Sequence, residues 1–307
     1  MIETINLTKK YGSLIAVDNI SFKVKKSEIF SFLGPNGAGK TTTIRMLATL
    51  LQPTSGEIII DGKSPGNGST YIRSVIGILT ENPGMYEKIT AYDNLMYFSS
   101  FYGLADKKRR TNIEKLLKMF GLWERRHELV STYSKGMKQK LSLARALIHE
   151  PKILFLDEPT SGLDPESARM VRDFIISLKK EETTVFLCTH NLAEASSLSD
   201  RVCIINREII KVASLEELQN YKKNRMAELI LKDDAKKYAG FLKDIKNILD
   251  VSIRDNKVLL SLSDPENTNP KIIKKLVERG AEIQYFNEIK ASLEDIYLDL
   301  MRTEKKQ

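Results

Sequence analysis

A glycine-rich loop near the start of the chain has the composition of a phosphate-binding site. It reads Gly34-Pro35-Asn36-Gly37-Ala38-Gly39-Lys40-Thr41, with four free positions between two glycines, then a lysine and a hydroxyl residue. The glycines let successive backbone amides turn toward one anion, and a following helix adds the partial positive charge of its N-terminus. Lys40 would supply a point charge for the terminal phosphates, and the Thr41 hydroxyl a magnesium ligand. The loop therefore predicts binding of a nucleoside triphosphate with Mg²⁺, by a stretch that ends with Thr42.

Two acids follow an apolar run later in the chain. Residues 153–156 are Ile-Leu-Phe-Leu, and Asp157 and Glu158 come directly after them. An acid at the carboxyl end of a strand faces the crevice where open α/β sheets bind ligands. Asp157 could hold magnesium through a water, and Glu158 could orient or deprotonate the attacking water. Acids often follow strands, so the pair is a weak signal alone, but together with the Lys40 loop it predicts nucleotide hydrolysis.

The elements that must position these residues alternate between strand and helix. Apolar runs predict buried strands, and apolar residues at helical spacing predict helices between them. The strands are expected at residues 20–24, 29–33, 58–60, 153–156, 184–188 and 202–205, and the helices at 41–51, 113–120, 136–149 and 170–178. Such alternation favours a mostly parallel sheet covered on both faces. An accidental glycine turn, expected in about one chain in a hundred of this length, is rarer still between a strand and a helix.

The composition of the chain changes after about residue 215. We expect one domain over residues 1–215, with a helical segment at about 85–150, and a small α+β domain over residues 216–307 that lacks a second phosphate loop. Residues 61–70 are expected to form a surface loop. In the second domain, strands are expected at 227–231, 251–254, 258–262 and 283–286, and helices at 235–249, 270–279 and 292–301.

Composition excludes several classes of protein. With 307 residues, 42% hydrophobic and 29% charged, the chain can bury a core and is unlike a disordered protein. No apolar stretch approaches the roughly 20 residues of a membrane span and the start lacks a signal peptide, so we expect a soluble protein. The net charge of +8 would suit a polyanion, but short charged runs are typical of solvated helix faces. Cys188 and Cys203 are too few for a disulfide framework or zinc cluster and are expected in the core.

The order of the motifs over roughly residues 2–215 resembles the nucleotide-binding subunit of ATP-binding-cassette (ABC) transporters. Tyr11 stands where that family stacks an aromatic residue on adenine. Residues 161–164, Ser-Gly-Leu-Asp, resemble the D-loop that crosses the family's dimer interface, and His190 matches its switch histidine, which reads the γ-phosphate. Taken singly, a tyrosine or histidine beside a strand is more often structural. The shared order favours the functional interpretation.

The signature loop of the family is recognisable but altered. Tyr133-Ser134-Lys135-Gly136-Met137 stands in place of Leu-Ser-Gly-Gly-Gln. By resemblance, Ser134 and the Gly136 amide, at a helix N-terminus, would hold the γ-phosphate of ATP bound to a second protomer. The lysine could add positive charge there, and the methionine removes a polar contact. The family's glutamine before the helical insertion is Glu81, which could still ligate magnesium but has lost the amide donor.

The resemblance implies a P-loop NTPase fold, with a RecA-like core, an antiparallel β subdomain and a helical insertion. It implies that two copies sandwich two ATP molecules, with Glu158 and His190 as catalytic residues. It also implies integral membrane permease subunits as partners, contacted by residues 81–102, and a cytoplasmic location on the inner face of the cell membrane. The implied metal ligands are Thr41, Glu81 and Asp157.

Three other functions stay open beside an export ATPase. Residues 290–298 look like the tail of export-type ABC ATPases that serve separately encoded permeases, often for drugs or antibiotics. A soluble mechanical ATPase acting on nucleic acid or the ribosome is one alternative, but the chain has neither a long coiled-coil insertion nor a second cassette, and we do not expect nucleic acid as a partner. A regulator that binds ATP without hydrolysing it is suggested by Glu81 and Met137. An importer ATPase is the third.

Overall fold

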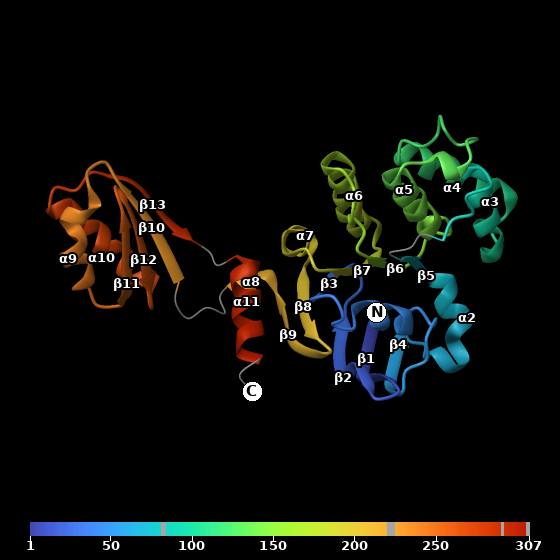
Figure 1. The fold of residues 1–307 in the computed structure, drawn as a ribbon, viewed down its shortest axis with the longest axis horizontal. Helices are drawn as coiled ribbons and strands as arrows, with labels where there is room; N and C mark the ends of the chain where they lie inside the picture. The colour runs from blue at the N-terminus through green and yellow to red at the C-terminus, as the bar shows by residue number, and fades with distance from the viewer. Residues whose placement is uncertain (81–83, 220–224, 290–291, 305–307) are drawn as a thin grey trace. The chain divides into compact units, whose positions relative to one another are not determined.

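The computed structural model describes residues 1–80, 84–219, 225–289 and 292–304. The chain divides into two compact units, Met1–Ser214 and Leu215–Gln307, and each is described by itself (Figure 1). Among the described residues, no helix is long and apolar enough to cross a membrane.

A six-stranded sheet forms the centre of the first unit. Its strand order is β5-β6-β7-β3-β8-β9, and all neighbours are parallel except β8 and β9. The expected mostly parallel sheet is confirmed, although the edge strands β5 and β9 were not predicted. The bounds are β3 Ile29–Leu33, β5 Ile76–Leu79, β6 Ile153–Asp157, β7 Thr184–Thr189, β8 Arg201–Asn206 and β9 Glu208–Ser214.

Each face of this sheet has its own hydrophobic core. Successive side chains of a strand point to opposite faces, so in β6 Leu154 and Leu156 join one core while Ile153 and Phe155 join the other. The first core is shared with α3 (Ala91–Ser99), α4 (Asp106–Met119), α5 (Lys135–Leu147) and α6 (Pro165–Leu178). Figure 1 shows α3, α4 and α5 gathered together, with the strands of a second sheet on the opposite side. These three helices are the expected helical insertion.

The second core joins the central sheet to a three-stranded antiparallel sheet. This sheet has the order β2-β1-β4, with β1 Ile2–Tyr11, β2 Leu14–Val24 and β4 Ser55–Ile60. Phe22 of β2 stacks on Phe30 of β3 at 5.6 Å between ring centroids and lies 5.8 Å from Phe186 of β7. Aromatic pairs at such separations add to the area they bury. The stack fixes the antiparallel sheet to the strand that leads into the phosphate loop.

The expected surface loop at residues 61–70 is wrong in its second half. Residues Pro65–Val75 form α2, with Ser64 as N-cap and Pro65 in the first turn. Proline is well tolerated there, because its fixed φ suits a helix and its missing N–H would be unpaired anyway. Ile72 and Val75 bury the inner face of the helix. The glycines at 66 and 68 are typical of loops, so the sequence did not predict this helix, which tertiary packing stabilises. The remaining helices of this unit are α1 Lys40–Leu47 and α7 Leu192–Leu198.

The second unit is an α+β fold with an antiparallel sheet of order β11-β12-β10-β13. Its core includes Leu229, Leu260 and Leu276. The helix expected over residues 235–249 is confirmed only in its first part, as a 3-10 turn at Ala235–Tyr238 followed by α9. Its second part is wrong, because α9 ends at Lys243, Asn247 adopts a left-handed φ of 75°, and the chain then enters β11. The bounds are α8 Leu215–Gln219, β10 Arg225–Leu231, α9 Ala239–Lys243, β11 Ile248–Arg254, β12 Lys257–Leu262, α10 Pro265–Glu278, β13 Ile283–Ile289 and α11 Leu293–Glu304.

Candidate functional site

The glycine-rich loop connects the end of β3 to the first residue of α1. Gly39 is the N-cap of α1 with a left-handed φ of 94°. A Cβ atom there would lie 2.5 Å from the Ala16 carbonyl oxygen, so only glycine fits. The loop therefore curls over the helix N-terminus as the sequence predicts, and its amides and the helix dipole favour an anion at the same point.

Lys40 is folded into the curl of this loop. Only 6% of the residue is exposed, and Nζ donates to the carbonyl oxygens of Gly34 and Pro35 at 2.7 and 3.1 Å. The Glu158 carboxylate lies 4.0 Å from the same nitrogen. A buried ammonium held by carbonyl dipoles is a positive charge that is already positioned and partly desolvated, as phosphate binding requires.

Thr41 and Asp157 come together from segments 116 residues apart. The Thr41 hydroxyl donates to Oδ2 of Asp157 at 2.8 Å, and Asp157 is 2% exposed at the end of β6. Hydroxyl and carboxylate oxygens are the hard donors that Mg²⁺ takes, usually with waters and substrate phosphates completing its shell. In the part of the chain that the structure describes, no three His, Cys, Asp or Glu residues cluster as a self-sufficient metal site. The pair fits a magnesium ion that arrives with a phosphate; the third predicted ligand, Glu81, lies outside the described residues.

Glu158 forms a dyad with His190. Oε1 of Glu158 accepts from the backbone N–H of His190 at 3.0 Å and lies 2.7 Å from Nδ1 of the same histidine. The backbone at Glu158 has φ 51°, a left-handed conformation that costs a residue with a side chain about 1–3 kcal/mol. Such strain persists only where the surroundings impose it, and here it turns the carboxylate back toward Lys40. This arrangement can orient a water molecule beside a phosphate.

Tyr11 joins these groups in one hollow of about 620 Å³. The ring is 47% exposed, and the Lys9 ammonium lies 5.3 Å from its centroid. An exposed ring at the rim of a phosphate site suits stacking on a flat base. The hollow is lined by Tyr11, Pro35, Asn36, Gly37, Gly39, Lys40, Thr41, Thr42, Asp157, Glu158, Ser161, His190 and Arg207, among others.

Arg207 is the one strongly charged member of this lining that the sequence analysis missed. It occupies the turn between β8 and β9 with φ 66°, and its backbone N–H donates to the Ala38 carbonyl oxygen at 3.0 Å. Among the described residues, no side chain or carbonyl accepts a hydrogen bond from its guanidinium. The available signal was its position two residues after the apolar run at 202–205, just beyond the carboxyl end of β8, which pairs with β3.

Ser134 and Gly136 do not line the hollow. Ser134 is the N-cap of α5, and its Oγ accepts from the Met137 N–H at 3.2 Å. Gly136 has room for a methyl group, with Leu163 Cδ2 3.6 Å from where its Cβ would lie. Within one protomer the structure therefore brings Tyr11, the loop, the acid pair and His190 together and leaves the altered signature loop apart.

Cys188 lies near Asp157 and Glu158, but its thiol is unreactive. It is fully buried in β7, and burial first, then the charge of Asp157, raises the pKa of its thiol. Burial likewise raises the pKa of the Cys203 thiol. The neutral thiol is a poor nucleophile, so both cysteines act as the core residues that the sequence predicts.

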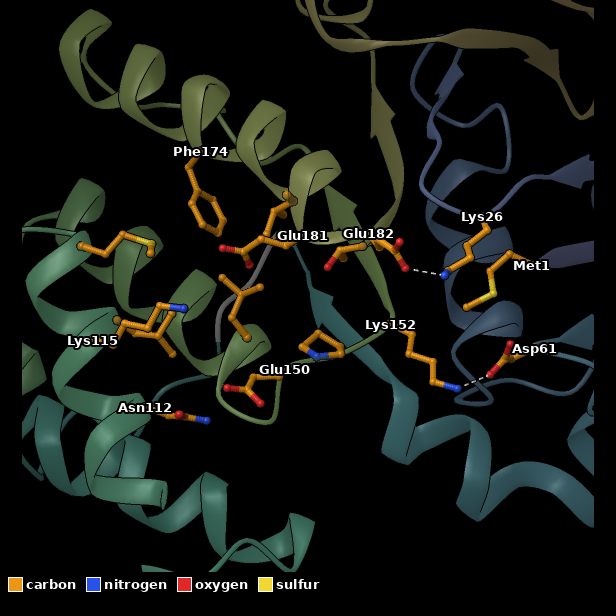
Figure 2. Close-up of a pocket in the computed structure, with 16 residues that line it drawn as sticks. Met1, Lys26, Asp61, Asn112, Lys115, Glu150, Lys152, Phe174, Glu181 and Glu182 are labelled. Atoms are coloured by element: carbon orange, nitrogen blue, oxygen red, sulfur yellow. Dashed lines mark hydrogen bonds and ion pairs between the residues drawn. The ribbon is translucent and has the colours of Figure 1, made fainter. Parts of the chain in front are cut away.

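A second hollow, of about 480 Å³, lies where the central parallel strands begin, which we call the amino edge of the sheet, whereas the first hollow lies at the carboxyl edge (Figure 2). Lys152 and Thr183, which immediately precede β6 and β7, belong to its wall, and Leu116 and Phe174 are among its apolar lining. Figure 2 shows two ion pairs at its rim, Lys26 with Glu182 at 2.5 Å and Lys152 with Asp61 at 2.8 Å. None of the predicted site residues lines it.

Comparisons with known proteins agree with this geometry. Residues 17–161 match the family model described as ABC transporter, and residues 214–301 match the C-terminal domain of DrrA1-3-like ATP-binding proteins. The chain is 37% identical over 303 residues to the bacitracin transport ATP-binding protein BcrA of Bacillus licheniformis, covering 98% of this chain and 97% of that one. It is 40% identical over 220 residues to a fluoroquinolones export ATP-binding protein of Mycobacterium tuberculosis, covering 71% and 72%.

Solved structures agree as well. One described as the ATP-binding subunit of an ABC transporter has a TM-score of 0.67 at 29% identity, covering 72% of this chain and 92% of that one. A dimeric cassette, MJ0796, described as a post-hydrolysis state bound to ADP and Pi, has a TM-score of 0.65 at 27% identity, covering 70% and 99%.

Proposed function

The chain belongs to the ABC transporter family as an ATP-binding subunit and ATPase, and on that premise we propose that it powers export of a drug or antibiotic through a separate membrane permease. The observation that carries the chemistry is the meeting of Lys40, Glu158 and His190 in one hollow. The bacitracin transport relative, which aligns over 98% of the chain, favours a transporter over a soluble mechanical ATPase. The name of the fluoroquinolones export relative favours export over import.

In the proposed reaction, the protein contributes mainly position and charge. The loop amides and Lys40 would hold the phosphates, while Glu158, fixed by His190, would orient the attacking water. Thr41 and Asp157 would hold Mg²⁺, which neutralises charge on the β- and γ-phosphate oxygens when bound. Tyr11 would stack on adenine, and Arg207 would add a second cation at the mouth of the hollow. Each group acts where negative charge spreads during phosphoryl transfer.

A second copy of the chain is the proposed source of the remaining contacts. Ser134 and the Gly136 amide stand at the first turn of α5, where the N-terminus of the helix favours an anion. Since they do not reach the hollow of their own protomer, they would act on the nucleotide of the partner, as in a two-fold sandwich. The dimeric cassette among the structural neighbours supports this assembly.

The proposed contact with the permease is an aromatic patch on the helical insertion. Tyr86, Tyr97 and Phe101 are 51%, 45% and 66% exposed, and Tyr97 lies edge-on to both others at 5.2 and 5.1 Å between centroids. Exposed rings that pack on one another are costly unless a partner covers them, which is typical of interaction sites. Arg145 supports the patch from below, 4.9 Å from the ring of Phe98. Binding there would hold the chain at the inner face of the cell membrane.

The test is reconstitution of the full chain with the integral membrane protein that co-purifies with it. We expect ATP-dependent phosphate release, and ATP-dependent movement of a drug-like cargo out of the compartment that holds the chain. A complex that binds ATP without releasing phosphate would instead favour the non-hydrolysing regulator. Loss of co-purification on Phe101→Ser, with ATP binding unchanged, would support the aromatic patch as the contact.

A further inference from the structure

Gln139 is a polar side chain enclosed within the base of α5. Only 7% of it is exposed, and its Nε2 donates to the carbonyl oxygen of Pro159 at 3.1 Å. Pro159 is itself buried and comes directly after Glu158. A buried carboxamide and a buried carbonyl are each costly unless paired. The bond therefore fixes the chain just beyond the acid to α5.

The turn at Glu158 and Pro159, which Gln139 contacts, has a strained backbone. Glu158 has a left-handed φ of 51°, and proline at the next position restricts its backbone further. Its N–H donates to the Cys188 carbonyl oxygen at 2.9 Å, which anchors the inner side of the turn to β7. Gln139 anchors the outer side. Strained backbone persists only where surrounding contacts fix it from several directions.

A second side chain of α5 holds the same turn, one helical turn nearer the start of the helix. A Cβ atom on Gly162 would overlap the Lys135 ammonium and lie 2.9 Å from Lys135 Cε. The lysine thus lies directly over the backbone of Gly162, which has φ 69°. Residues 135 and 139 are four apart and share one face of the helix. That face follows the chain from Pro159 to Gly162.

We propose that Gln139 is a positioning residue for Glu158, and that through Gln139 and Lys135 helix α5 sets the orientation of the acid. This inference rests on the proposed function. α5 begins at Ser134, the residue expected to meet the nucleotide of a second protomer. A shift of α5 when that nucleotide binds would move the chain just after Glu158 through the Gln139 bond to Pro159 and the Lys135 contact with Gly162. Engagement of one ATP then prepares the acid that acts on the other.

Replacing Gln139 by methionine tests this in the full chain, because methionine keeps the volume and removes the donor. We expect Gln139→Met to lower kcat for ATP hydrolysis at least about tenfold and to change KM for ATP less than about twofold. The matched control is Asn112→Leu. Asn112 is also 7% exposed on a helix, and its Nδ2 donates to the Ile148 carbonyl oxygen at 2.9 Å, away from the turn. Both variants lose a similar buried bond, but only the first should lose kcat.

Combination with Glu158→Gln separates positioning from general damage. If Gln139 acts through the acid, the double variant in single-turnover hydrolysis should be slower than Glu158→Gln by less than about twofold. The inference would be overturned if the fold-losses in rate of Gln139→Met and Glu158→Gln multiplied in the double variant. An equal fall of kcat in Asn112→Leu, or full activity of Gln139→Met, would overturn it as well. A wild-type chain that releases no phosphate with its membrane partner would overturn the proposed function as well, whereas the other outcomes leave that function intact.

Discussion

The two edges of the six-stranded sheet use charge in opposite ways. At the amino edge, cations and acids are paired with one another, as Lys26 is with Glu182 and Lys152 with Asp61. At the carboxyl edge, Lys40 donates to two carbonyls of its own loop and has Glu158 only 4.0 Å away, Glu158 accepts from the backbone N–H of His190, and the Arg207 guanidinium has no partner among the described residues. Exposed pairs satisfy each other and add little stability. Charges held mainly by backbone carbonyl and N–H groups keep their capacity to act on a ligand, whereas charges paired with each other at the surface do not.

The largest expected effect is on the acid of the carboxyl edge. Glu158→Gln should bind ATP but lower steady-state phosphate release by about 10²–10⁴-fold, because the amide cannot take a proton from the attacking water. The ATP-bound protein should accumulate as a dimer in size-exclusion chromatography. Glu182→Gln, at the amino edge, is the matched control and should keep its hydrolysis rate. Equal rates for the two variants would remove Glu158 from the reaction.

The next effect separates the two lysines. Lys40→Ala should weaken ATP binding at least about tenfold in calorimetry, since it removes a desolvated cation held 4.0 Å from the acid. Lys152→Ala removes an exposed cation paired with Asp61 and should leave ATP affinity unchanged. Similar losses in both would mean that net charge, rather than the loop, attracts the nucleotide.

A third prediction concerns pH and the amino edge. His149 is 9% exposed, its ring stacks on Tyr102 at 3.7 Å, and Nε2 lies 2.9 Å from the Ile76 carbonyl oxygen at the start of β5. Burial lowers its pKa from 6.5 to about 4. The unfolded chain binds this proton first, so the stability from neutral His149 is full above about pH 6.5 and falls as pH drops toward 4. Thermal unfolding of His149→Gln should depend less on pH in that window; an unchanged slope would contradict the assignment.

The smallest expected effect is at the rim of the site. Arg207→Gln should raise the Kd for ATP about threefold, because an exposed guanidinium is screened by solvent. The effect should shrink as salt is raised, and AMP, with its single phosphate, should show less of it than ATP. A salt-independent change would mean that the variant alters the turn, whose N–H binds Ala38, rather than the charge.

Sequence predicts well where the chemistry is contiguous. The loop at 34–41 and the pair at 157–158 each carry their own signal, and an apolar run before each locates them at strand ends. Arg207 and Gln139 carry no such signal, since their roles depend on what the fold brings beside them. Helix α2 was missed because glycine is typical of turns. The helix expected over 235–249 was given too late an end, because the helical pattern of the sequence continues past Asn247, where the chain turns. The signature loop stays a prediction for a second copy of the chain.

The aromatic stack of Phe22, Phe30 and Phe186 has a consequence for which lengths of nucleotide the site can bind. The stack packs the sheet that contains Tyr11 against the strand that precedes the phosphate loop. The core therefore fixes the distance between the Tyr11 ring and Lys40. A ligand whose base rests on the ring must bring a tail of the right length to the lysine. We therefore expect the buried aromatic stack to make binding depend on the number of phosphates in the ligand as well as on their charge.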